Sequence, residues 1–130
     1  MGLWVHGDLM RFVVQEHHAT HLHWDFRLEL DGVLKSWAIP KEPPINRGVK
    51  RLAIQVDDHD VSYIDFEGEI PEGYGAGTVR IWDRGEYELK ERKNDKLVFS
   101  LKGTKLKGEY CLVRFKTREK KRKNWLFFKI

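Results

Sequence analysis

The stretch Leu22–Leu30, LHWDFRLEL, alternates strictly between apolar and polar side chains. Strict alternation predicts a β-strand, because successive side chains of a strand point to opposite faces. Asp31-Gly32 follows at once, and the apolar segment VLKSWAI occupies residues 33–39. An Asp-Gly pair between two strand-like segments indicates a tight hairpin. The polar face of the first strand then carries His23, Asp25, Arg27 and Glu29.

Similar strand signals recur along the chain at the spacing that all-β barrels and sandwiches show. A Pro-rich loop is expected at 40–48, a glycine-rich connection at 69–77, and a turn at Asp83-Arg84-Gly85. We predict a single domain over residues 1–130 with an all-β, mostly antiparallel fold: a compact β-barrel with short loops or helical turns. The further predicted strands are 11–15, 51–57, 61–66, 78–82, 86–90, 96–101, 108–115 and 124–130.

Composition excludes some classes of protein and leaves others open. The 130 residues are 41% hydrophobic, which is enough for one core, and no window has the apolar length of a membrane span. The N-terminus lacks the pattern of a signal peptide. A single cysteine, Cys111, excludes an internal disulfide and is expected to be a small buried side chain in a strand.

Positive charge gathers in the last third of the chain. Residues 90–130 hold 15 of the 24 Lys and Arg residues but only 4 of the 20 Asp and Glu residues. This asymmetry fits either a surface that binds a polyanion such as nucleic acid or a solubilising, solvated face. The densest run, REKKRK at 118–123, lies between two predicted strands and is therefore expected to be a basic loop.

Four histidines fall within the seven residues 17–23. On a strand, His23 and Asp25 would share a face with Cα atoms about 7 Å apart, close enough to hold one cation. His17, at the end of the preceding strand, is a candidate third ligand, and Arg27 could bind an anion held by the cation. Such a nitrogen and oxygen donor set suits Mn²⁺, Fe²⁺, Co²⁺ or Zn²⁺. The alternative is a hydrogen-bonded His-Asp pair without a metal.

A second polar cluster surrounds His59, whose neighbours are Asp57, Asp58 and Asp60. Acidic neighbours should raise the pKa of His59, and a protonated imidazole could bind phosphate or protonate a leaving group. The alternative is a solvated acidic turn. By themselves, three further polar residues near strand ends carry no functional signal: Lys41, Arg51 and Tyr63.

The segment FVVQEHHATHLHWDFRLELDGVLKSWAIPKEP, residues 12–43, closely resembles the 3′-phosphoesterase module of bacterial ATP-dependent DNA ligase D, an end-joining enzyme. The resemblance continues over residues 51–88 and through KLKGEYCLVRF and KNWLFFKI. Its signature is Gln-x-His-x-Ala-x-x-Leu-His-x-Asp-Phe-Arg, followed by Asp-Gly-x-Leu-Lys-Ser-Trp-Ala and then Asp-His.

The resemblance implies a Mn²⁺-dependent β-barrel that heals 3′ ends of DNA or DNA/RNA. Such an enzyme removes a 3′-terminal ribonucleoside and then the remaining 3′-phosphate, leaving a 3′-hydroxyl. The family's functional residues fall as follows: metal ligands on His17, His23 and Asp25; the phosphate-binding arginine on Arg27; a further histidine and tyrosine on His59 and Tyr63; and substrate-binding positions on Lys41, Arg51 and Asp57.

The resemblance also implies a cytoplasmic, DNA-associated prokaryotic protein that works with a separate DNA ligase or polymerase. The chain is expected to be a stand-alone version and a monomer, with no membrane partner. The segment before Arg11 is shorter than the N-terminal arm of fused relatives. Two rival functions remain: a non-catalytic nucleic-acid-binding barrel, and a small non-haem iron oxygenase that uses the same donor set.

Overall fold

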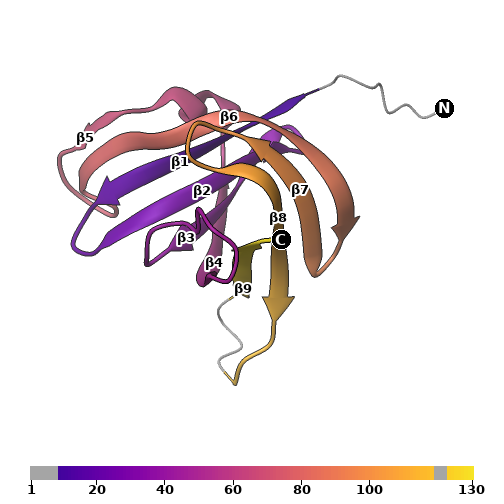
Figure 1. Ribbon diagram of the computed structural model, residues 1–130. Helices are drawn as coiled ribbons and strands as arrows, with labels where there is room; N and C mark the ends of the chain where they lie inside the picture. Colours follow the sequence, from indigo (N-terminus) through magenta and orange to yellow (C-terminus); the bar gives the residue numbers. More distant parts are fainter. Residues whose placement is uncertain (1–8, 119–122) are drawn as a thin grey trace.

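A computed structural model describes residues 9–118 and 123–130 (Figure 1). Of the predicted basic loop 118–123, residues 119–122 lie outside the described part. Nine strands and one short 3₁₀ helix make up the regular structure: β1 (Met10–His18), β2 (Leu22–Leu30), β3 (Val33–Ile39), β4 (Lys50–His59), η1 (Val61–Asp65), β5 (Gly68–Ile70), β6 (Gly77–Lys93), β7 (Lys96–Lys102), β8 (Lys107–Phe115) and β9 (Lys123–Lys129).

The strands form a closed antiparallel barrel, which confirms the predicted fold class. The sheet order is β1-β2-β3-β4-β9-β8-β7-β6-β5, and β1 also pairs with β6, so eight strands close on themselves. The short β5 adds to the edge of β6 outside the closed ring. Closure leaves no unpaired edge along most of the sheet, which protects the backbone hydrogen-bonding groups. No helix among the described residues has the length and apolar character needed to cross a membrane.

Aromatic and aliphatic side chains fill the inside of the barrel. Phe26 lies at the centre, with its ring centroid 4.7 Å from that of Phe127 and 5.8 Å from that of Phe99. The apolar face of β2 contributes Trp24, Phe26 and Leu28 to this core, as the alternation predicted. Cys111 is buried, also as expected.

The middle of the polar face of β2 is buried too, which the sequence did not predict. A second, smaller cluster of Val13, Leu34 and Ile64 lies outside the barrel, where η1 packs over β1 and β3. The covering chain leaves Asp25 only 6% and Arg27 only 3% exposed. A polar face covered in this way has the low dielectric of an interior rather than of a surface.

The prediction of a strand at 61–66 was wrong, because this segment forms η1 instead. The Asp60 side chain accepts a hydrogen bond from the Ser62 backbone N–H at 2.9 Å and so caps the helix. Ile64 is the buried residue of the turn, and it anchors η1 on the small outer cluster. The predicted connection 69–77 likewise contains part of a strand, because β5 ends at Ile70.

The predicted turn at Asp83-Arg84-Gly85 was also wrong. These residues continue the long strand β6, and the hairpin to β7 comes only after Lys93. Trp82 forms a bulge, because Val14 pairs with Asp83 while Gln15 pairs with Ile81. Turn-forming residues are also common at bulges, so composition alone could not separate the two.

Asp83 has a structural role of its own. Its buried carboxylate accepts hydrogen bonds from the backbone N–H groups of Thr104 at 2.8 Å, Lys105 at 3.1 Å and Leu106 at 2.8 Å. Gly103 passes so close that an added Cβ would lie 2.3 Å from Asp83 Oδ2. The carboxylate therefore fixes the loop between β7 and β8 against the barrel.

We predict that Asp83→Ala lowers the free energy of unfolding by about 3 kcal/mol, because it leaves buried backbone donors without a charged acceptor. Urea denaturation followed by circular dichroism would measure the change. Glu86→Ala, which removes an exposed carboxylate from the same strand, is the matched control and should leave stability nearly unchanged. Equal stability of the two variants would contradict this role of Asp83.

Candidate metal centre

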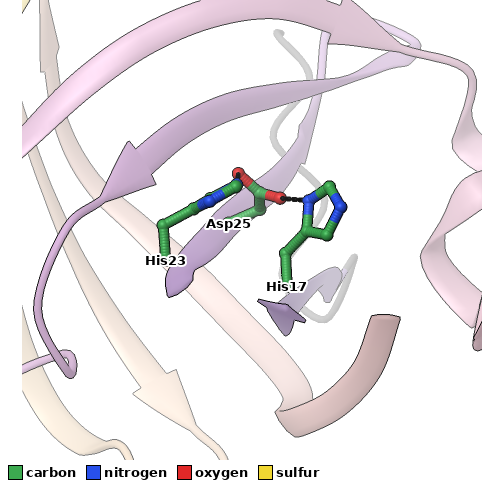
Figure 2. A group of neighbouring side chains, drawn as sticks. All are labelled: His17, His23 and Asp25. Carbon is green, nitrogen blue, oxygen red and sulfur yellow. Dashed lines mark ion pairs between the residues drawn. The ribbon is translucent and has the colours of Figure 1, made fainter. Parts of the chain in front are cut away.

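The β1–β2 hairpin sets the positions of the three candidate ligands. His17 pairs with His23 and Gln15 pairs with Asp25 in its register, so the three ligands occupy adjacent positions on the outer face. The two imidazole centroids lie 4.7 Å apart. Figure 2 shows both rings turned toward the Asp25 carboxylate between them.

The donor atoms of His17, His23 and Asp25 all lie within 4.8 Å of one another. His17 Nδ1 is 3.4 Å from Asp25 Oδ2, and His23 Nε2 is 3.3 Å from Asp25 Oδ1. Nitrogen and oxygen donors that converge in this way can hold a divalent cation with positions left open for substrate and water. The expected convergence of these three residues is therefore present.

Backbone carbonyls fix the tautomers of both histidines. His17 Nε2 lies 2.7 Å from the Gly75 carbonyl oxygen, and His23 Nδ1 lies 3.1 Å from the His21 carbonyl oxygen. Because a carbonyl can only accept, these ring nitrogens carry the protons. His17 Nδ1 and His23 Nε2 then face Asp25, where each can share a proton with the carboxylate or give its lone pair to a cation in place of that proton. The residues present thus fit a divalent metal.

Gly75 is a site residue that the sequence analysis missed, since the sequence predicted only a glycine-rich connection at 69–77. Its φ of 80° lies in the left-handed region that favours glycine. An added Cβ would make only an ordinary van der Waals contact, 3.5 Å from His17 Cε1, so the backbone conformation is what favours glycine here. The glycine therefore lets the loop bring a carbonyl oxygen to the back of the His17 ring.

Charge coupling within the cluster favours an ionised Asp25. Burial alone would raise the pKa of Asp25, but the hydrogen bond with His23 and the charge of Arg27 outweigh it and lower that pKa. The same hydrogen bond raises the pKa of His23, although burial opposes this shift. A carboxylate that stays ionised in a buried position is a strong attractor for a cation.

Arg27 is more constrained than the sequence suggested. Its Nε donates to Gln15 Oε1 at 2.6 Å, and its Nη1 contacts both Ser36 Oγ at 2.8 Å and His59 Nδ1 at 3.1 Å. Only Nη2 remains, 3.4 Å from Asp25 Oδ2. Arg27 therefore holds its neighbours in place and offers one edge of its guanidinium to an anion.

Gln15 is the second residue that the sequence analysis left without a role. It is fully buried, and its Nε2 donates to the backbone carbonyl of Tyr63 at 3.0 Å and of Phe66 at 3.3 Å. It joins Arg27 to the segment that contains η1. Its place on the same strand face as His17 was the signal available in the sequence.

The structure brings His59 to Arg27, but it contradicts the expected rise in the pKa of His59. Burial and the nearby charge of Arg27 lower that pKa instead. A guanidinium can only donate, so the 3.1 Å contact with Arg27 favours a lone pair on His59 Nδ1 and a proton on Nε2. The Asp57 carbonyl lies 3.2 Å from the same Nδ1 atom and favours the opposite tautomer. The lowered pKa favours a neutral imidazole, and the shorter contact with Arg27 favours its Nε2–H form.

The remaining predicted residues differ in how closely they join this group. The Tyr63 ring centroid lies 4.9 Å from that of His59 and 5.0 Å from Arg27 Cζ, so Tyr63 belongs to the cluster. Burial raises the pKa of its hydroxyl. Lys41 and Asp57 are exposed, and Arg51 donates to the Glu42 carbonyl at 2.8 Å. No direct contact joins these three side chains to the ligands among the described residues.

Comparison with known proteins identifies the family to which the chain is similar. Residues 15–114 match the model of the DNA ligase D 3′-phosphoesterase domain. The matched range contains every candidate site residue named above, including all three proposed ligands.

Curated relatives agree. The chain is 50% identical over 127 residues to the multifunctional non-homologous end joining protein LigD of Pseudomonas aeruginosa, covering 93% of this chain and 15% of that protein. It is 50% identical over 115 residues to the LigD repair protein of Mycobacterium tuberculosis, and this match covers 85% of the chain and 15% of that protein. It is 42% identical over 132 residues to LigD of Mycolicibacterium smegmatis, and this match covers 92% of the chain and 17% of that protein. The chain spans about one sixth of these relatives and belongs to the DNA ligase D 3′-phosphoesterase domain family.

Proposed function

We propose that this chain is a metal-dependent phosphoesterase that heals the 3′ ends of DNA for end joining. The observation that carries the proposal is the convergence of two oriented imidazole nitrogens and one ionised carboxylate beside a buried guanidinium. Family membership supports the substrate class. A 3′-terminal ribonucleoside would be removed first and the 3′-phosphate second, leaving a 3′-hydroxyl for a separate ligase or polymerase in a prokaryotic cytoplasm.

The proposed metal ligands are His17 Nδ1, His23 Nε2 and an Asp25 oxygen. This donor set without a thiolate suits Mn²⁺, with Fe²⁺, Co²⁺ and Zn²⁺ as alternatives. When bound, such a cation supplies Lewis acidity toward a phosphoryl oxygen. The carbonyls of Gly75 and His21 keep the two rings oriented for this task.

The protein's own donors then act on the phosphate. Arg27 presents Nη2 next to Asp25, where it can donate to a non-bridging phosphate oxygen. Neutral His59 can donate from Nε2–H to a second oxygen as negative charge develops on the phosphoryl group. It acts in this proposal as a hydrogen-bond donor rather than as a cation. Tyr63 can add its hydroxyl from the same side.

Lys41, Arg51 and Asp57 are proposed to contact the substrate beyond the scissile phosphate. The exposure of Lys41 and Asp57 leaves both side chains accessible to a nucleic-acid strand. Positive charge in the C-terminal third would add contacts with strand phosphates, and such binding weakens as salt rises. Residues 1–130 are proposed to form one domain that works as a monomer.

We predict that His23→Ala lowers hydrolysis of a primer-template with two 3′-terminal ribonucleotides in Mn²⁺ by about a hundredfold or more. Gel analysis of the product ends separates the ribonucleoside step from the phosphate step. Mn²⁺ affinity from calorimetry should fall in the same variant. The control is His18→Ala, because within residues 9–118 and 123–130 the only hydrogen bond of the His18 side chain is with Glu16. Wild-type hydrolysis by His23→Ala would refute the assignment.

A second prediction concerns the protonation of His59. Nitrogen chemical shifts measured across a pH series should show the Nε2–H tautomer and a pKa below the ordinary 6.5. We expect a lowered pKa because protonation of His59 would place a second positive charge against Arg27. The stability that His59 contributes should be lost as pH falls from 6.5 through the lower folded-state pKa.

Arg27→Gln tests the cause of this shift, since it removes the charge while burial remains. The pKa of His59 should move upward in this variant, provided that circular dichroism shows the same fold. A wild-type pKa at or above 6.5, or an Nδ1–H tautomer, would contradict the proposed donor role.

A further inference from the structure

One end of the barrel opens into a cavity of about 440 Å³ that the candidate metal centre does not use. Trp37 and Trp125, both almost completely buried, form its apolar floor with Leu97. The Trp125 indole N–H donates to Gln55 Oε1 at 3.1 Å and fixes that side of the floor. Cavities of about 300–1,000 Å³ are the size of ordinary small-ligand sites.

Positive side chains surround this floor. Five of the residues that line the cavity are cationic and none is a carboxylate. They come from four strands, β3, β6, β8 and β9, so tertiary structure gathers charges that are far apart in the sequence. We call them the mouth cations: Lys35, Arg92, Lys93, Arg114 and Lys123.

The mouth cations are only partly neutralised. Arg92 binds Asp31 through two contacts, of 2.9 and 2.5 Å, Lys35 binds Asp58 at 3.1 Å, and Lys93 Nζ lies 3.5 Å from Glu91 Oε2. Arg114 and Lys123 have no ion pair with any residue in the described part of the chain. Asp57 and Asp58 line an adjoining hollow, so these carboxylates border the cavity but do not line it.

Like charges that converge on a concave surface produce a focused positive potential. A multiply charged oxyanion relieves their repulsion, and the planar guanidinium of Arg114 matches phosphate oxygens geometrically. The apolar floor leaves room for a sugar or base next to the charged group. A carboxylate ligand would neutralise fewer of these cations than a phosphate.

We infer that this cavity is a second phosphate-binding site, which takes a strand phosphate of nucleic acid or the phosphate of a free nucleotide. Its lining includes inward-facing Trp37 and Trp125, whereas the candidate metal ligands lie on the outer face. The inference therefore does not depend on metal binding or hydrolysis. It gives a defined location to part of the positive charge in the C-terminal third.

The test is a titration of the whole chain with pyrophosphate, followed through the indole N–H resonances of Trp37 and Trp125. Both resonances should shift with saturation. Arg114→Gln should weaken pyrophosphate binding by about tenfold, because it removes a charge-assisted hydrogen bond. Lys107→Gln removes a positive charge from the other end of β8 and should leave the affinity within about twofold of wild type.

Two further measurements complete the test. A competition experiment distinguishes a nucleic-acid strand from a free nucleotide, and a variant of the metal centre separates the cavity from the candidate metal site. A short oligothymidylate that displaces pyrophosphate far better than thymidine monophosphate assigns the cavity to a strand, whereas equal displacement assigns it to a free nucleotide. His23→Ala should bind pyrophosphate in the cavity like wild type, which keeps this result independent of catalysis. Unshifted indole resonances at millimolar pyrophosphate, or equal weakening by Arg114→Gln and Lys107→Gln, would overturn the inference.

Discussion

The hydrogen bond of 2.6 Å from Arg27 Nε to Gln15 Oε1 is the interaction on which the candidate site depends. A buried guanidinium is costly unless its donors are satisfied. Gln15 satisfies one donor and, through its own amide, binds the backbone on either side of the end of η1. One side chain thus joins two strands of the barrel to the segment that covers them and brings His59 and Tyr63 into place.

Covering the outer face changes the chemistry of the polar residues on it. Alternation along β2 by itself yields a solvated row of His, Asp and Arg, in which electrostatic interactions are weak. Under η1 and the Gly75 loop, the same row acquires oriented imidazole rings and an ionised carboxylate, and burial beside Arg27 lowers the pKa of His59 on β4. Preorganised donors of this kind favour charge that develops on a phosphate.

The two faces of the barrel wall carry different sets of charged side chains. The outer face of β1 and β2 holds converging ligands of mixed charge, which suit a cation and its bound phosphate. The inner rim at one end holds cations with no lining carboxylate, which suit an anion alone. A closed sheet makes this separation possible, because alternate residues of one strand serve opposite faces.

The sequence by itself determined the barrel, the apolar face of β2 and the convergence of His17, His23 and Asp25, since period-two alternation and hairpin pairing are local properties. It could not decide whether Asp83-Arg84-Gly85 was a turn or a bulge, whether 61–66 was a strand or a helix, or which way the pKa of His59 shifted. Those outcomes depended on distant groups: the loop amides bound to Asp83, the outer cluster under Ile64, and buried Arg27 beside His59. Gly75 and the mouth cations likewise acquired their roles only when the closed barrel brought distant segments together, because burial and long-range charge are properties of the tertiary structure.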